Sequence, residues 1–516
     1  MKNKIYAIFF AASALLGMSA CDSLDLVPES TIADSGYWKT ADQFNAFNTG
    51  IASYFRYYYW NCFAYGEVRA GHYGDAPFGG EATQGCENFY QNSLSLTSPG
   101  ISNYGGLYYP INQINLMIAK AEETNLITEA DKSYYLGAAY GLRAYLYFHL
   151  LRSYGDVILH TTYTSGSNLD LSNLNRAQDP ASSVMEQIKS DIKASEMAFA
   201  ENYAFTKGKN FWSLGATKML KAEVYLWSGK QMGGGATDYN TAKTALQDVD
   251  KCAGLGLMDS YTDVFSFEKK KNKEIIFIIY YGENEAALLG GSWNSNFMPQ
   301  QAYMNNGLRY TEKGEEVSKT KDAQINGLIR MPLKRNSYTE LYKDNDCRKR
   351  ANLRAVYTKN KAGDLEYEAT YPYKYQGTLL AGASVRSMYD DYPVYRYADR
   401  LLLMAEVKAL LGEDIAAEIN AVRQRAYGDN YSSAVAYPND TDVTEFVGSD
   451  ADPVEAVLKE RLREFIFEGR RWYDIRLFDK AEKYSTAISS RLLWPIDQGT
   501  LTNNNKLEQT PGYKMN

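Results

Sequence analysis

The sequence is poor in the residues that metal sites and many hydrolases use. Only 3 of its 516 residues are histidines, and it contains no HExxH zinc motif, no GxSxG nucleophile motif and no P-loop. Its 5 cysteines include no CxxC pair and no Cys/His cluster. No sequence motif therefore supports an enzymatic function. We predict no cofactor and no metal, and we leave open a calcium ion held by scattered acidic loop residues.

A surplus of basic residues and a second long apolar run are also missing. The chain carries 55 Lys and Arg against 62 Asp and Glu, a net charge of −7, which argues against nucleic acid as a partner. Beyond the first residues, no apolar run approaches the ~20 residues of a membrane-spanning helix. Beyond Cys21, the remaining cysteines are Cys62, Cys86, Cys252 and Cys347, which allow three full disulfide pairings or free thiols.

What is present begins with an export signal. Met1–Lys4 supplies two lysines, Ile5–Leu16 is an apolar or small run of twelve residues, and a small-residue stretch leads to Cys21. This run is too short for a spanning helix and is typical of a cleaved signal peptide. The segment resembles a bacterial lipoprotein signal, so we predict a signal peptide at 1–20, lipid on Cys21 and a flexible tether at 21–40. The alternative is an ordinary signal peptide in which the cysteine is incidental.

Hydrophobic residues recur at helical spacing in two blocks of the chain. The spacing predicts helices at about 41–60, across 107–260 and across 393–480, with an especially strong helix from Asp131 to about Tyr154. Asp42 is placed to cap the first helix. A β-type run, Glu274–Tyr280, ends the first block.

Three of these helices share a weak internal similarity. Leu142-Arg143-Ala144, Leu220-Lys221-Ala222 and Leu403-Met404-Ala405 each place a small residue in mid-helix. A small residue lets a second antiparallel helix approach closely, which is the logic of tetratricopeptide-type hairpins. We therefore predict a mainly α fold, built as a scaffold of helical hairpins in a single domain over 41–516. Two loop-rich parts, at about 61–106 and 282–392, interrupt this scaffold.

Four segments carry distinctive motifs: residues 138–157, with AAYGLRAYLYF and RSYGDV; residues 392–406, with YPVYRYAD and LMAE; residues 460–476, ERLREFIFEGRRWYDIR; and residues 493–513, with LWPID and QTPGY. Together these segments resemble the SusD/RagB family of outer-membrane nutrient-binding lipoproteins. The resemblance implies a SusD-like fold and a shallow glycan-binding surface built from loops. It also implies a partner, a SusC-like TonB-dependent β-barrel transporter, with the protein lipid-anchored in the outer membrane and facing outward.

The 460–476 segment crowds acidic and basic residues around apolar ones. Opposite charges three or four residues apart, such as Arg461 with Glu464, can pair along a helix. Glu464 and Glu468 could instead serve as a glycosidase pair, but a general acid needs a raised pKa, and arginines lower it. We therefore interpret the segment as a structural network, and we expect Arg143 and Arg396 to lock helices together.

The unusual abundance of tyrosine, 44 residues, suits a sugar-binding surface. Aromatic rings stack on the C–H faces of sugars, while amides, arginines and carboxylates bind their hydroxyls. The residues that we single out as candidate glycan contacts lie in the two loop-rich parts: Trp293, Tyr303, Phe297, Tyr73, Phe78, Arg69, Glu67 and Tyr389. Trp293 ranks first, because its Gly-Ser and Asn-Ser flanks give few local reasons for burial. By contrast, we expect the aromatic run at 57–60 to be mostly helix core.

The function that we predict is a non-catalytic, cell-surface glycan-binding lipoprotein that captures oligo- or polysaccharide for import. One alternative is a peptide-binding lid of a peptide importer, because the resembled family includes such members. Another is a surface glycosidase. The sequence names neither the sugar nor its linkage.

Overall fold

The structure is a computed structural model that describes residues 37–75, 83–165, 172 and 174–513. The predicted signal peptide, Cys21, most of the tether and Phe78 lie outside these residues. Among the helices of the described ranges, none is long and apolar enough to cross a lipid bilayer.

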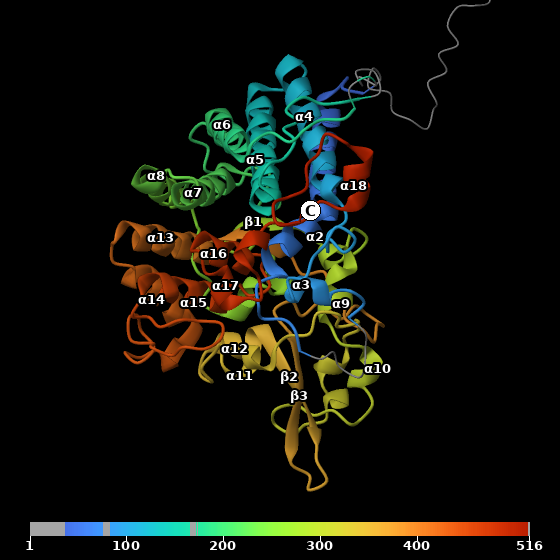
Figure 1. The fold of residues 1–516 in the computed structure, drawn as a ribbon, viewed down its shortest axis with the longest axis vertical. Coiled ribbons are helices and arrows are strands. Elements are labelled where there is room, and N and C mark those ends of the chain that lie inside the picture. Colours follow the sequence, from blue (N-terminus) through green and yellow to red (C-terminus); the bar gives the residue numbers. More distant parts are fainter. Residues whose placement is uncertain (1–36, 76–82, 166–171, 173, 514–516) are drawn as a thin grey trace, which may run out of the picture.

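Helices dominate the molecule, and only four short strands accompany them in the described part (Figure 1). The longer helices of the first block are α2 (Ala41–Glu67), α4 (Tyr108–Glu123), α5 (Glu129–Tyr154), α6 (Ala181–Phe199), α7 (Leu214–Gln231) and α8 (Gly235–Val249). Those of the second block are α13 (Tyr397–Leu411), α14 (Ala416–Tyr427), α15 (Pro453–Phe465) and α16 (Arg471–Leu477). The prediction of a mainly α fold is confirmed.

Shorter elements fill the rest of the chain. The short α-helices are α3 (Glu87–Tyr90), α9 (Ser292–Phe297), α10 (Gln301–Met304), α11 (Arg335–Thr339), α12 (Cys347–Asn352), α17 (Ala481–Tyr484) and α18 (Gln498–Asn503). The 3-10 turns are η2 (Tyr104–Leu107), η3 (Tyr261–Val264), η4 (Phe267–Lys269), η5 (Leu288–Gly291), η6 (Val317–Lys319), η7 (Lys321–Ala323), η8 (Gly428–Asn430) and η9 (Ser489–Arg491).

The long helices pack as neighbours in chain order. Helix α5 packs against α4 and α6, α7 against α8, and α13 bridges the two blocks by contacting α8, α14 and α15. The three predicted small positions, Ala144, Ala222 and Ala405, are all buried at such contacts. Gly141 on α5 serves the same purpose, since a Cβ there would lie only 2.0 Å from Nε1 of Trp212. The structure thus confirms the hairpin scaffold.

The first helix begins at Ala41, as predicted, but its cap and its C-terminal end differ from the prediction. Its cap is Thr40 rather than Asp42, because Gln43 folds back and its Oε1 accepts a hydrogen bond from the Thr40 amide at 3.0 Å, completing a capping box. The helix also continues to Glu67, past the expected end near Trp60. Residues 61–67 therefore belong to the rigid scaffold and not to a loop.

The described residues form two antiparallel strand pairs. One pair joins segments far apart in the sequence, and the other joins neighbouring segments. Strand β1 (Ile275–Ile279), predicted from its apolar run, pairs with β4 (Tyr392–Arg396), which leads directly into α13. Strands β2 (Leu353–Lys359) and β3 (Leu365–Pro372) form a hairpin that extends away from the helices (Figure 1). This hairpin was not predicted, because it lies in the part expected to be loop.

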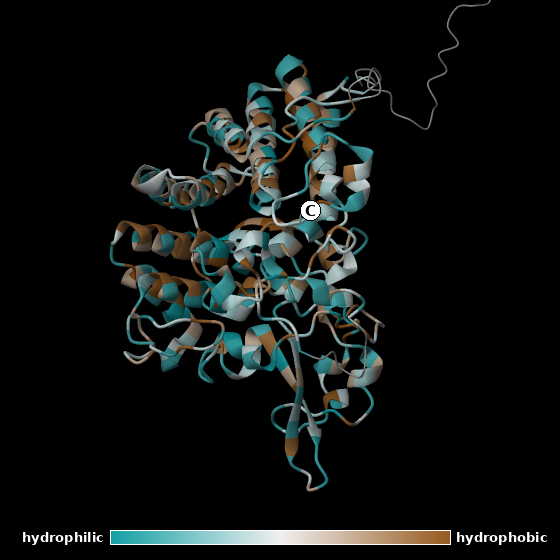
Figure 2. Cartoon of the chain, in the orientation of Figure 1, coloured by the Kyte–Doolittle hydropathy of each residue, from teal (hydrophilic) through white to brown (hydrophobic). Residues whose placement is uncertain are grey.

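One large hydrophobic core runs through most of the molecule, and a smaller cluster joins α13, α14 and α15. Figure 2 shows hydrophobic residues concentrated along α13, at the centre of this second cluster. The four cysteines of the described residues, Cys62, Cys86, Cys252 and Cys347, are free thiols. The fold is therefore held by packing and ion pairs in this part of the chain.

Candidate functional site

Trp293 and Phe297 do not lie on a surface loop. Both belong to α9 and are fully buried, with 0% of Trp293 exposed. The Trp293 ring lies 4.9 Å from that of Phe297 and meets Tyr375 edge-on at 5.0 Å. The expectation of an exposed Trp293 is wrong because Gly290 and Gly291, with φ of 64° and 83°, turn the chain inward. In this structure neither ring offers a face to a sugar.

Glu67, the last residue of α2, is also buried, and it holds a distant turn. Its carboxylate accepts hydrogen bonds from the backbone amides of Phe467 (3.0 Å) and Gly469 (3.1 Å). His72 contacts the same carboxylate at 3.0 Å through Nε2, and the Tyr73 hydroxyl donates to it at 3.3 Å. Phe467 and Gly469 have φ of 68° and 70°, a conformation that leaves their amides without helical partners. Glu67 and Tyr73 thus stabilise the scaffold.

Arg69 fastens α2 to the C-terminal segment. It donates to Asn92 Oδ1 at 2.7 Å and to the carbonyls of Arg491, Leu492 and Leu493. Its guanidinium lies 4.4 Å from the centre of the Trp472 ring, and burial lowers its pKa to about 10. A fully enclosed arginine of this kind is a packing residue.

Tyr303 and Tyr389 keep part of their surface exposed. The Tyr303 ring lies under the Arg309 guanidinium at 4.1 Å, and Arg309 pairs with Glu368 of β3 at 2.7 Å. Tyr303, Arg309 and Glu368 therefore present a ring edge, a cation and a carboxylate beside the β2–β3 hairpin. Tyr389 precedes the buried Asp390. A glycan contact at either tyrosine stays a prediction, and Phe78 lies outside the described residues.

The charged 460–476 segment forms a buried network, as predicted, but with partners in other elements. Arg396 at the end of β4 contacts Glu274 (2.8 Å), Glu464 (2.6 Å) and Glu468 (2.8 Å). Arg461 pairs with Asp474 at 2.9 Å rather than with Glu464 on its own helix. The network therefore ties the two helical blocks together through β1 and β4.

The protonation of this network argues for a structural role. Burial would raise the pKa of Glu464, but Arg425, Arg396 and Arg348 more than offset it and hold that pKa well below its usual range. The pKa of Glu468 is likewise lowered, against burial, by Arg396 and Lys374. The lowered pKa values favour ionised carboxylates that accept hydrogen bonds, as predicted. Arg143 also has its expected role, since it joins α5 to Asp191 of α6 at 2.7 Å.

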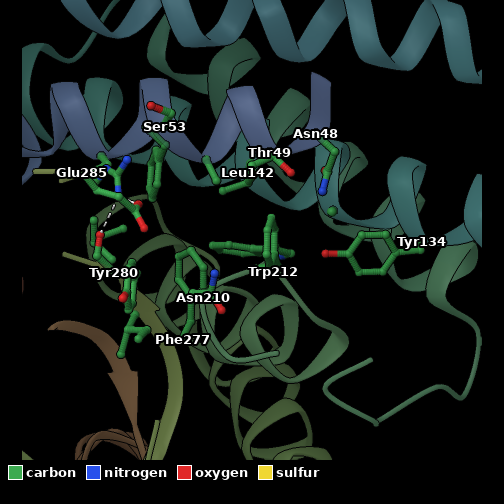
Figure 3. A pocket seen from close by; sticks show the side chains of 17 residues that line it. Asn48, Thr49, Ser53, Tyr134, Leu142, Asn210, Trp212, Phe277, Tyr280 and Glu285 are labelled. Carbon is green, nitrogen blue, oxygen red and sulfur yellow. Dashed lines mark hydrogen bonds and ion pairs between the residues drawn. The ribbon is translucent and has the colours of Figure 1, made fainter. Parts of the chain in front are cut away.

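A pocket of about 110 Å³ opens between α2, α5 and β1, away from the predicted contacts (Figure 3). Trp212 and Phe277, whose rings meet edge-on at 5.1 Å, belong to its apolar lining. Figure 3 shows the Tyr134 hydroxyl pointing toward Trp212, with Asn48 beside it. Sequence reasoning missed this pocket because its residues come from four separate segments and form no local motif.

Exposed tyrosines on α2 were missed as well. Tyr59 is buried, as expected for the 57–60 run, but 76% of Tyr57 is exposed. Tyr54 and Tyr109 are also exposed, and their rings meet edge-on at 5.0 Å. The helix therefore carries aromatic faces toward solvent near the pocket.

Comparison with known proteins places this geometry in a family. The model of the SusD family matches residues 258–491, and a second model, described as "Starch-binding associating with outer membrane", matches residues 81–217. The curated SusD-like protein P38 of Formosa agariphila is 26% identical and is aligned over 99% of this chain and 100% of its own.

Several solved structures are similar to the chain. The structure of NanU from B. fragilis is 51% identical, covers 95% of this chain and 100% of its own, and superposes with a TM-score of 0.90. A laminarin-binding SusD-like protein has the same fold at 21% identity, with 92% of this chain and 100% of its own covered and a TM-score of 0.70. The prediction of a SusD-like fold is therefore confirmed.

Proposed function

The chain belongs to the SusD/RagB family, and on that premise we propose that it is a non-catalytic glycan-binding lipoprotein of the cell surface. It captures an oligo- or polysaccharide and delivers it to a SusC-like TonB-dependent transporter in the outer membrane. The observation that carries this proposal is the match of residues 81–217 to a family described as starch-binding and associated with the outer membrane. The laminarin-binding protein of the same fold supports the choice of a glycan.

The chemistry of the partly exposed residues is compatible with sugar binding. Beside the β2–β3 hairpin, Tyr303, Arg309 and Glu368 combine an aromatic ring with a charged donor and an acceptor. Such a mixture recognises the apolar face and the hydroxyl rim of a sugar together. Glu464 and Glu468, whose pKa values are lowered by neighbouring cations, support binding without catalysis.

Isothermal titration calorimetry against soluble polysaccharides, followed by product analysis, tests the proposal. We expect binding to at least one glycan, and we expect that glycan to be recovered intact. Tyr303→Ala should weaken binding by about tenfold, or about 1.4 kcal/mol. Tyr431→Ala is the control, because Tyr431 is partly buried but follows α14. Binding of mixed peptides with no response to any glycan would favour the peptide-binding alternative, and release of sugar would favour a glycosidase.

Membrane attachment through Cys21 is part of the same proposal. Replacing Cys21 with Ser should move the protein from the membrane fraction to the soluble fraction and abolish incorporation of labelled palmitate. Cys86→Ser, which leaves the proposed anchor intact, is the matched control. Co-purification of the anchored wild-type protein with a TonB-dependent barrel tests the transporter partnership, which fails if no barrel is recovered.

A further inference from the structure

The three most exposed aromatic residues of the described chain lie together. They are Tyr54 and Tyr57 on α2 and Tyr109 near the start of α4, and 37%, 76% and 44% of their surface is exposed. Helices α2 and α4 pack against each other, and the Tyr54 and Tyr109 rings meet edge-on at 5.0 Å (Figure 1). Single exposed apolar residues are normal on a protein, whereas rings gathered in one patch mark a site of interaction.

A fourth ring, the partly buried Tyr58, joins the exposed rings into one surface. It meets Tyr57 edge-on at 5.0 Å and lies 6.1 Å from Tyr109. Tyr54, Tyr57 and Tyr58 are three and four residues apart, so they share one side of α2. We call these four residues the tyrosine surface. Because its rings brace one another on two packed helices, little conformational entropy is lost when a ligand binds.

The tyrosine surface offers uncovered ring faces, which the group beside the β2–β3 hairpin lacks. Arg309 lies over the Tyr303 ring at 4.1 Å, whereas no Lys or Arg of the described residues lies over a ring of the tyrosine surface. A hydrogen bond with Tyr54, followed by burial, raises the pKa of Tyr109 to about 12, so the Tyr109 hydroxyl is neutral near pH 7. Flat rings with hydroxyl tips match the C–H faces and hydroxyl rims of sugars.

The area of the tyrosine surface suits a glycan better than a protein. A tyrosine side chain has about 150–250 Å² of surface, so the three exposed rings together present about 200–400 Å². A stable protein interface buries about 800 Å² on each partner, which is at least twice that area. A short stretch of sugar rings needs only a few aromatic rings beneath it.

The tyrosine surface is also open. Its exposed rings lie on the outer side of two helices, and none of them lines the pocket of about 110 Å³ between α2, α5 and β1. A ligand is therefore not enclosed at either end, and a sugar chain has room to continue past the rings in both directions.

We propose that the tyrosine surface binds the interior of a glycan chain by stacking, with Tyr57 as its principal contact. This inference rests on the proposed function, because it takes the ligand to be a glycan. It adds a binding surface on the helical scaffold, on α2 and α4, to the Tyr303 group beside the hairpin. It also adds a preference for long chains over single sugars.

Calorimetry with the full-length mature protein tests the proposal against soluble starch, laminarin and a wider panel of soluble polysaccharides. Tyr57→Ala should weaken binding about tenfold, whereas Tyr57→Phe, which keeps the ring, should stay within about twofold of the wild-type protein. Tyr109→Ala should also weaken binding. Met197→Ala is the matched control, because Met197 on α6 is 71% exposed and should change nothing. All four changes are at exposed side chains, so thermal unfolding should show that each variant folds.

A series of oligosaccharides cut from the polysaccharide that binds tests the open shape of the surface. Affinity should rise from the disaccharide to longer oligosaccharides, because each further sugar reaches another ring. In Tyr57→Ala this rise should be smaller. Equal affinity of the wild-type protein for the disaccharide and the longest oligosaccharide would overturn the proposed binding of a chain interior.

The outcomes separate this proposal from the function on which it rests. Full affinity in both Tyr57→Ala and Tyr109→Ala would overturn the tyrosine surface as a glycan site and leave the glycan-binding function standing. An equal loss in Tyr57→Phe and Tyr57→Ala would overturn stacking as the mode of binding. If Tyr57→Ala bound glycan normally but no longer co-purified with a TonB-dependent barrel, the surface would be a protein contact instead. If no polysaccharide bound to the wild-type protein, both proposals would fall.

Discussion

The carboxylate of Glu67 accepts a hydrogen bond from the backbone amide of Phe467, at 3.0 Å and across 400 residues of sequence. This contact joins the end of the first long helix to the turn that follows α15. Both groups are buried, so the contact is protected from water.

Replacing Glu67 with Ala should destabilise the protein strongly. The change leaves the buried amides of Phe467 and Gly469 without an acceptor, at about 1–3 kcal/mol each. Glu67→Gln, which keeps one acceptor oxygen, should lose less. Chemical denaturation followed by circular dichroism measures the shift in midpoint. Glu283→Ala, at an exposed acid, is the control, and an unshifted midpoint in Glu67→Ala would contradict the assigned role.

Replacing Arg396 with Met should also destabilise the protein strongly, because it removes a buried positive charge. Arg396 faces three buried carboxylates, and removing one partner of a buried ion pair costs about 3–5 kcal/mol. Thermal unfolding of the variant should show a much lower Tm. Lys230→Met breaks a largely exposed pair with Asp479 and should cost less than about 1 kcal/mol. Equal losses in the two variants would be inconsistent with a buried network.

Asp390 should make stability depend on pH near neutrality. Burial raises its pKa to about 7, although the Gly377 amide, Lys270 and Arg386 act in the opposite direction. Because this value exceeds the unfolded pKa of about 3.9, the folded state retains the proton longer. Its contribution to the free energy of unfolding is therefore complete below about pH 4 and is lost as the pH rises through 7.

The Asn variant isolates this effect. Asp390→Asn cannot ionise, so its stability relative to the wild-type protein should increase by about 1–4 kcal/mol between about pH 5 and pH 8. Denaturation midpoints over that range measure the difference. Asp259→Asn, at a side chain that is 97% exposed, should show no such trend. A flat difference curve for Asp390→Asn would mean that Asp390 is already ionised at pH 5.

Substitutions of Trp293 test whether this residue is part of the core or a ligand contact. Trp293→Ala should cost about 3–5 kcal/mol of stability, because it empties a fully enclosed site. Trp293→Phe, which keeps a ring, should retain glycan affinity within about twofold, or about 0.4 kcal/mol. Calorimetry on the folded Phe variant is the decisive measurement. Loss of glycan binding at an unchanged Tm would restore Trp293 as a direct contact.

The periodicity of the sequence was sufficient to find the long helices, because their buried faces repeat over many turns. The 131–154 helix was predicted to within two residues of α5, and the β-type run became β1. The β2–β3 hairpin was missed, since its strands lie among turn-rich segments and its pattern is short. The start of α2 was predicted at Ala41, but its cap and its C-terminal end were missed, because the Thr40–Gln43 capping box and the Glu67 contacts involve side chains rather than periodicity.

The candidate site was harder to predict than the scaffold. Flanking Gly and Ser suggested a loop around Trp293, whereas two left-handed glycines bury it. The backbone groups that Glu67 and Arg69 bind lie about 400 residues away, beyond the reach of any local pattern. The sequence did not indicate that Tyr57 is exposed and Tyr59 buried, because a run of aromatic residues does not show which side of the helix faces solvent.

Arg69 binds the carbonyl of Leu493, which lies 424 residues later in the chain, so this contact can form only late in synthesis. At about 5–20 residues per second, a ribosome makes the second partner about 20–80 s after the first. During that interval α2 cannot complete its docking. The protein completes this attachment only after residues 491–493 have been made, so a truncation before Arg491 would remove the three carbonyls that accept hydrogen bonds from the Arg69 guanidinium.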